Sequence, residues 1–144
     1  MIRNGLALLC GLAVGSALNQ LIIQINTGLL FPMPAGSDMH DLNQLNRYLS
    51  TLPAAAFLVT IIGHLTQSFV GAWVAARAAA SRPMVLALII GLLSLAAGIM
   101  AMSLFEGPSW MAIELPLYLL VAWLAGRMEQ RRRSIPSIQN AGEE

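Results

Sequence analysis

Residues 84–105 read MVLALIIGLLSLAAGIMAMSLF, an apolar stretch that contains no charged side chain. An α-helix rises about 1.5 Å per residue, so about 20 apolar residues cross a hydrocarbon core that is about 30 Å thick. The stretch is therefore long enough to span a lipid bilayer by itself. Its length and composition place the protein in the membrane-embedded class.

Three further apolar stretches of similar length accompany it, at residues 5–25, 53–76 and 110–126. Because 57% of the residues are hydrophobic and only 10% are charged, little of the chain is left for a soluble domain. We therefore predict an all-α polytopic membrane protein. Its four transmembrane helices would form an antiparallel bundle within residues 1–133.

The first link between these helices is the only one with room for structure of its own. Residues 31–36, FPMPAG, must leave the helix because two prolines and a glycine interrupt it. Ser37 or Asp38 then offers an N-cap, and leucines recur at spacings of three and four. This pattern predicts a short amphipathic helix over about residues 38–50, on the outer membrane surface. Residues 134–144 are polar and are predicted to form a disordered tail.

The basic residues are all arginines, and they are distributed very unevenly across the predicted membrane. Only Arg47 lies on the side of the amphipathic helix. The positive-inside rule therefore predicts that both chain ends lie in the cytoplasm, where arginines also attract anionic headgroups at about 1 kcal/mol each. The seven arginines on that side are Arg3, Arg77, Arg82, Arg127, Arg131, Arg132 and Arg133.

Small residues at helical spacing are the predicted contacts between the helices. Lipid tails are as apolar as leucine, so transmembrane helices associate through close van der Waals contact at small side chains. Gly11 and Gly15 form a GxxxG pattern that could serve packing within the bundle or pairing with a second copy. Cys10 beside them is expected to be a small buried residue. The predicted packing residues are Gly11, Gly15, Gly71, Gly91 and Gly98.

Polar side chains inside the spans are the main clue to function, because each is costly in hydrocarbon. Counting along the helices from the outer boundary places Glu114 about 6–8 Å and His64 about 16 Å below the surface. The gap between them is too long for a direct bond unless helix tilt or Pro116 closes it, so we expect a glutamine or a water to bridge them. The candidate ligand or ion-binding residues are Thr60, His64, Gln67, Glu114, Tyr118, Gln20 and Gln24.

Three interpretations of this polar cluster stay open. A carboxylate and a histidine in a low dielectric suit a proton relay or a cation site. Together with the amides they could instead hold the polar end of a lipid or a quinone. In the third interpretation the polar groups only form hydrogen bonds that fix the helix packing. Neither His40 nor His64 has a second histidine or cysteine at ligand spacing, so we expect no metal and no cofactor.

The sequence contains no catalytic motif and no basic, base-reading surface for nucleic acid. We therefore expect a non-enzymatic membrane protein, an accessory, assembly or small-ligand-binding subunit. Its partners would be the lipid bilayer and a homo-oligomer or larger membrane complex. The alternative is a small oligomeric transporter or channel that uses His64 and Glu114 for proton or cation handling.

Three segments carry a resemblance to a known group of proteins: FPMPAGSD at 31–38, GHLTQSFVGAWVAAR at 63–77 and IELPLYLLVAWLAGR at 113–127. With these segments the chain resembles small four-helix inner-membrane proteins of bacteria, a group without an assigned role. The resemblance extends over nearly the whole chain. It implies a location in the bacterial inner membrane and adds no mechanism.

Overall fold

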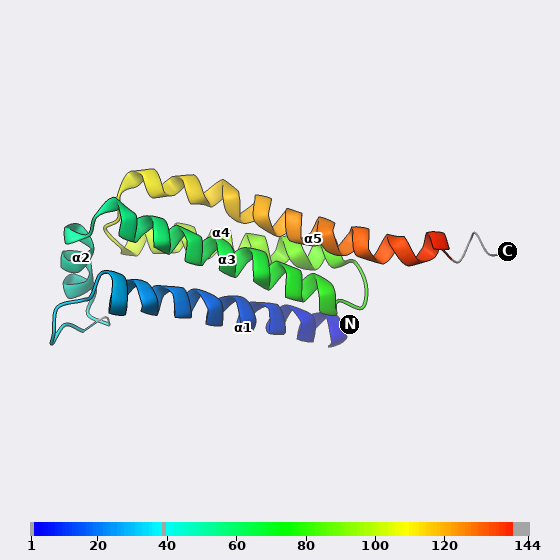
Figure 1. Cartoon of the computed structure of the whole chain (residues 1–144), viewed down its shortest axis with the longest axis horizontal. Helices are drawn as coiled ribbons and strands as arrows, with labels where there is room; N and C mark the ends of the chain where they lie inside the picture. Colours follow the sequence, from blue (N-terminus) through cyan, green and yellow to red (C-terminus); the bar gives the residue numbers. More distant parts are fainter. Residues whose placement is uncertain (1, 39, 140–144) are drawn as a thin grey trace.

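Four long helices lie side by side in the computed structural model, and a short helix crosses one end of them (Figure 1). The structure describes residues 2–38 and 40–139, and the side chains up to residue 134. Residues 2 and 139 lie at the opposite end from the short helix, which we call the terminal end; the other is the α2 end. The helices are α1 (Ile2–Ile25), α2 (Leu42–Thr51), α3 (Ala54–Ala78), α4 (Pro83–Leu104) and α5 (Glu114–Gln139).

The four long helices are each apolar and long enough to cross a membrane. No strand occurs among the residues that the structure describes. The predicted all-α, polytopic fold is thereby confirmed, and the chain is a multi-pass membrane protein. Successive long helices run antiparallel, because only short links join α3 to α4 and α4 to α5.

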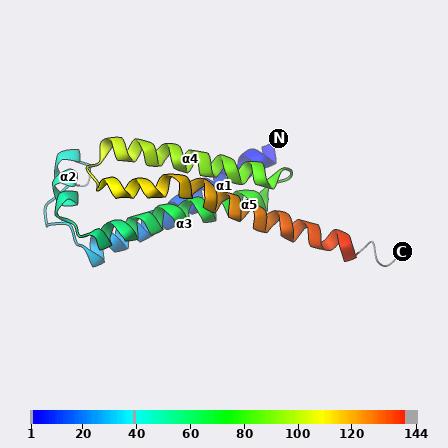
Figure 2. The same cartoon turned by 90° about the horizontal axis from the view of Figure 1, so that it is seen from above.

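Two helices are longer than the sequence suggests. α1 begins at Ile2 and continues as a π-helical segment, Asn26–Leu30, before the chain turns at the prolines. α5 extends to Gln139 and runs past the other helices at the terminal end (Figure 1 and Figure 2). The prediction of a disordered tail is therefore wrong for residues 134–139, and residues 140–144 lie outside the described part of the chain. Ion pairs at i,i+3 and i,i+4 spacing join Glu129 to Arg132 and Arg133, just before residues 134–139.

α3 is the central helix, because it alone contacts α1, α4 and α5 extensively. α1 approaches it so closely that a Cβ added to Gly11 would lie 2.4 Å from the carbonyl oxygen of Gly71. A Cβ added to Gly15 would lie 2.6 Å from the carbonyl oxygen of Gln67. The GxxxG pattern therefore serves packing within the chain. Cys10 faces away from this contact and is exposed, which corrects the expectation that it is buried.

The contact between α4 and α5 is equally close. A Cβ at Gly91 would lie 2.7 Å from the Cβ of Ala122, and one at Gly98 would lie 2.7 Å from the ring of Tyr118. Toward the terminal end the space between the helices is filled by small and aliphatic side chains. The buried core there consists of Ala7, Ala72, Ala75, Ala76, Ala79, Leu86, Ala87, Ile90, Ala122 and Ala125.

The short helix α2 is capped by Asp41, whose carboxylate accepts hydrogen bonds from the backbone amides of Asn43 and Gln44. The sequence predicted Ser37 or Asp38 at this position. The Asp38 carboxylate instead accepts the amide of residue 40 in the preceding turn. The side-chain amide of Gln44, followed by the two backbone amides, lowers the pKa of Asp41 below its usual value.

The close approach of α1 to α3 generates a prediction about Gly11. We expect Gly11→Ala to destabilise the protein by about 1–3 kcal/mol, because the added methyl group meets backbone that cannot move aside. Gly5→Ala is the matched control: its Cβ meets nothing within 4 Å, and alanine is the better helix former by about 1 kcal/mol. Unfolding in mixed detergent micelles measures both changes. Equal effects of the two substitutions would contradict this description of the contact.

Candidate functional site

The interior carries an ionisable pair toward the α2 end. Nδ1 of His64, on α3, lies 3.2 Å and 3.3 Å from the two carboxylate oxygens of Glu114, the first residue of α5. The Glu114 side chain is only 3% exposed, whereas that of His64 is 24% exposed. A buried carboxylate is thus covered by an imidazole that is itself partly accessible.

This direct contact corrects the predicted gap between the two side chains. A 3₁₀-helical segment, Ser109–Ile113, precedes Glu114. A 3₁₀-helix rises about 2.0 Å per residue rather than about 1.5 Å, so these 5 residues carry Glu114 about 2.5 Å deeper than an α-helix would, which closes only part of the predicted gap of about 8–10 Å. Trp110 in this segment packs edge-on against Phe57 of α3, with ring centroids 6.4 Å apart. That contact holds the segment against α3, and no bridging glutamine is needed.

Tyr118 lies one turn after Glu114 and is almost fully buried. Its side chain interacts with the Glu114 carboxylate, and its ring lies over Gly98 of α4. Its backbone carbonyl accepts a hydrogen bond of 3.1 Å from the Ser68 hydroxyl on α3. The Glu114 carboxylate therefore contacts His64 and lies near Tyr118, and the site joins α3, α4 and α5.

A second polar contact joins α1 to α3. The Asn26 side-chain nitrogen donates to the carbonyl oxygen of Ala56 at 2.9 Å and to the Thr60 hydroxyl at 3.2 Å. Asn19 lies against Gly63, where a Cβ would come within 2.8 Å of its side-chain oxygen. The side-chain oxygens of Asn19 and Asn26 are buried and have no hydrogen-bond partner among the described residues. Each keeps the capacity to accept a donor.

Four of the seven predicted candidate residues make side-chain interactions between or within helices in the structure, and the three glutamines do not. His64, Glu114 and Tyr118 come together, and Thr60 joins the contact with α1, as described above. Gln67 meets α1 through its backbone carbonyl, which lies against Gly15. Gln20 and Gln24 are exposed on the side of α1 that faces away from α3, so they are not part of the cluster. Asn26 and Ser68, which are not among these candidates, form side-chain hydrogen bonds between helices.

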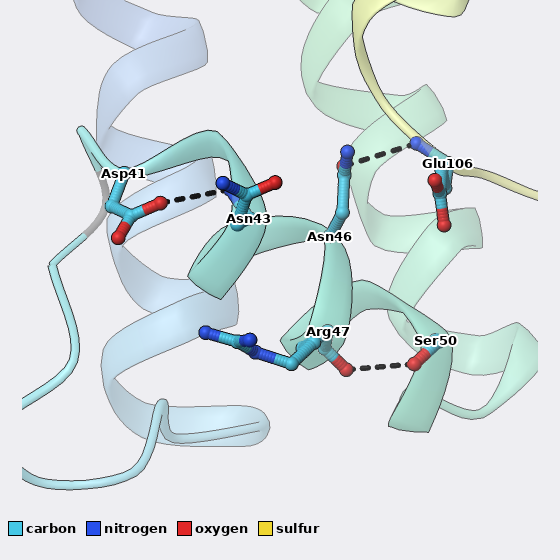
Figure 3. Close-up of a pocket in the computed structure, with 6 residues that line it drawn as sticks. All are labelled: Asp41, Asn43, Asn46, Arg47, Ser50 and Glu106. Atoms are coloured by element: carbon cyan, nitrogen blue, oxygen red, sulfur yellow. Dashed lines mark hydrogen bonds between the residues drawn. The ribbon is translucent and has the colours of Figure 1, made fainter.

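The surface of the α2 end carries an open hollow of about 400 Å³ (Figure 3). The Asn46 side-chain oxygen accepts the backbone amide of Glu106 at 3.1 Å there, which ties α2 to the link between α4 and α5. None of the predicted candidate residues lines it. Its lining, from α2 and that link, is Asp41, Asn43, Asn46, Arg47, Ser50 and Glu106.

A second buried carboxylate, Glu129, lies at the terminal end and is 1% exposed. Arg132 and Arg133 contact it at 2.6 Å and 2.7 Å, and Arg77 of α3 lies 3.6 Å away. Glu129 is not among the site residues predicted from the sequence. The available signal was the i,i+3 and i,i+4 spacing of a glutamate and two arginines on one helix.

Arg133 also caps α3. Its guanidinium donates to the carbonyl oxygens of Ala76 and Ala79 at 2.8 Å and 2.9 Å. These are among the carbonyls that the end of a helix leaves without partners, and a cation there also suits the helix dipole. From α1, the Asn4 side chain accepts the backbone amide of Ala80 at 2.9 Å. Arg133 therefore has a structural role in addition to the predicted role in orientation and headgroup binding.

Comparisons of the chain with protein-family models, with curated proteins and with solved structures find no match. Its function must therefore be inferred from its own side chains. Within residues 2–38 and 40–139, no three His, Cys, Asp or Glu side chains are placed to hold a metal ion. What the site offers chemically is a buried carboxylate in hydrogen-bond contact with an imidazole.

The direct contact between His64 and Glu114 can be tested by a double-mutant cycle. We expect His64→Ala and Glu114→Ala each to destabilise the protein, and the double variant to cost less than their sum by about 0.5–3 kcal/mol. The measurement is unfolding in mixed micelles. A control cycle that pairs His64→Ala with Glu106→Ala, an exposed glutamate, should be additive within about 0.5 kcal/mol. Additivity in both cycles would mean that the two side chains do not interact.

The neighbouring arginines of α5 offer a second matched comparison. We expect Arg133→Ala to destabilise the protein by about 2–4 kcal/mol, because it removes charge-assisted hydrogen bonds to Glu129 and to the end of α3. Arg131→Ala removes an exposed arginine from the same basic run and should change stability by less than about 0.5 kcal/mol. Thermal unfolding in detergent separates the two. A uniform effect across the run would favour a general lipid or topology role.

Proposed function

We propose that the chain is a non-enzymatic subunit of the bacterial inner membrane that supports the assembly or action of a larger membrane complex. In this proposal both chain ends face the cytoplasm and α2 lies on the outer surface. Seven of the eight arginines belong to the terminal end or its links, and this distribution supports the orientation through the positive-inside rule.

The pairing of ionisable groups inside the helix bundle is the observation that carries the proposal. Glu114 is in contact with His64, and Glu129 is bound by arginines. Between these two carboxylates the described buried residues are mainly alanine, leucine and isoleucine, and the buried serines there, Ser68 and Ser94, are isolated. A single chain therefore offers no continuous polar route from one surface to the other. Such an interior suits a rigid frame that presents its outer helix faces to other subunits.

The alternative, proton or cation handling, is favoured by one specific feature. The partly exposed imidazole of His64 separates the buried Glu114 carboxylate from the surroundings, so it could pass a proton to or from the interior. Because the apolar core lies beyond Tyr118, complete passage would need a route between several copies. This function therefore requires an oligomer.

Purified protein in liposomes distinguishes the two functions. We expect no pH-dependent proton or cation flux from the wild-type chain alone, and no change in flux with Glu114→Gln. Native mass measurement after mild extraction should show this chain with a second subunit at fixed stoichiometry. A flux that Glu114→Gln abolishes, while the surface control Glu106→Gln retains it, would establish transport and overturn the accessory role.

A further inference from the structure

One side of α1 has no neighbour in the bundle. α1 lies at the margin of the molecule and contacts mainly α3 (Figure 1). Gly11 and Gly15 face α3, whereas the opposite side is exposed along its length. We call this side the α1 outer face. Its exposed residues include Leu6, Cys10, Ala13, Ala17, Gln20 and Gln24.

Of the two glutamines on this face, Gln20 lies at a depth well inside the helix bundle and Gln24 lies about one turn nearer the α2 end. Asn19 lies against Gly63 of α3, so the next residue, Gln20, lies near the same level. Gly63 is about 14 Å from the start of α3, measured by the helical rise. Neither glutamine side chain has a hydrogen-bond partner among the described residues. An amide that faces hydrocarbon without a partner is costly, so we expect another protein surface to cover this face.

The spacing of these six residues along the face is compatible with a second helix packed against it. Its six residues follow one another at intervals of four, three, four, three and four. Apolar and small residues with this period of 3.5 form the seam of two helices that wind around each other. Ala13 and Ala17 allow the two backbones to approach closely, and the glutamines supply hydrogen bonds between the helices.

We propose that the α1 outer face is the site where two copies of this chain pair, α1 against α1. Each copy has a fixed orientation in the membrane, so a twofold axis normal to the bilayer brings the same residues together. A glutamine amide both donates and accepts, so Gln20 and Gln24 can each bond their counterparts in the second copy. The face carries no charged side chain that would repel its own copy.

This pairing differs from an association through the GxxxG pattern. Gly11 and Gly15 are already in contact with the α3 backbone, so a partner there would have to displace α3. The α1 outer face needs no such rearrangement. The pairing is also independent of the accessory role, because the same dimer could exist with or without other subunits.

The single cysteine of the chain gives a direct test. Cys10 lies on the α1 outer face, so the twofold arrangement brings it close to Cys10 of the second copy. Oxidation of the full-length protein in its native membrane should give a disulfide-linked dimer. In a Cys10→Ala background, Ala17→Cys should restore the cross-link because it lies two turns further along the same face. Leu92→Cys, equally exposed on α4, should give none.

Several outcomes would overturn the proposal. These are the absence of a dimer from both Cys10 and Ala17→Cys, equal cross-linking from Leu92→Cys, and an adduct with a different protein in place of the dimer. Cross-linking is carried out at a low protein-to-lipid ratio, so that chance collisions between unpaired copies are rare. Each result is read by mass on non-reducing gels.

The glutamines provide a second measurement that does not depend on cysteine chemistry. Gln20→Leu with Gln24→Leu should weaken dimerisation in lipid nanodiscs or mild detergent about tenfold, because hydrogen bonds between the helices are lost. Gln130→Leu, an exposed glutamine of α5, is the control and should leave the monomer–dimer equilibrium unchanged. Equal dimerisation of all three proteins would contradict the assigned role of the glutamines.

Discussion

In hydrocarbon no solvent satisfies a polar group, so each one must find its partner within the protein or at a protein surface. This constraint explains where the charges of the chain lie. Glu114 meets His64 and Tyr118 near the α2 end, and Glu129 meets arginines at the terminal end. The apolar core lies between these two points, so the same contacts that satisfy the carboxylates also hold the helix ends together.

Close backbone contact accounts for the rest of the architecture. Gly11 meets Gly71 between α1 and α3, and Gly91 meets Ala122 between α4 and α5. Van der Waals attraction falls off steeply with distance, so these small residues decide which helix faces can associate in lipid. α3 becomes the central helix because small residues lie on several of its sides. α1 is left at the margin, with one face in the bundle and one available to a second copy.

Function follows from this division between satisfied and unsatisfied polar groups. In the proposed accessory role the paired carboxylates stabilise the helix bundle, and the alternative, proton handling, depends on the partly exposed His64 beside Glu114. The exposed amides of Gln20 and Gln24 remain without partners in a single chain. The proposed subunit that pairs through α1 accounts for both observations. The carboxylates of its interior have partners within the chain, and the amides of the α1 outer face would gain partners in the second copy.

The sequence alone determined the four membrane spans, because the length of an apolar run must match the thickness of the bilayer. It also indicated the exit from the first span at FPMPAG and the small residues that form the contacts. Only the tertiary structure decided that Glu114 reaches His64 directly, that Asp41 caps α2 and that Cys10 faces outward. Spacing along a helix fixes which residues share a face. The depth of a side chain in the bundle also depends on local 3₁₀ geometry and helix tilt. The residue that it contacts depends on how each helix is rotated against its neighbours. Spacing along one helix specifies neither the depth nor the contact.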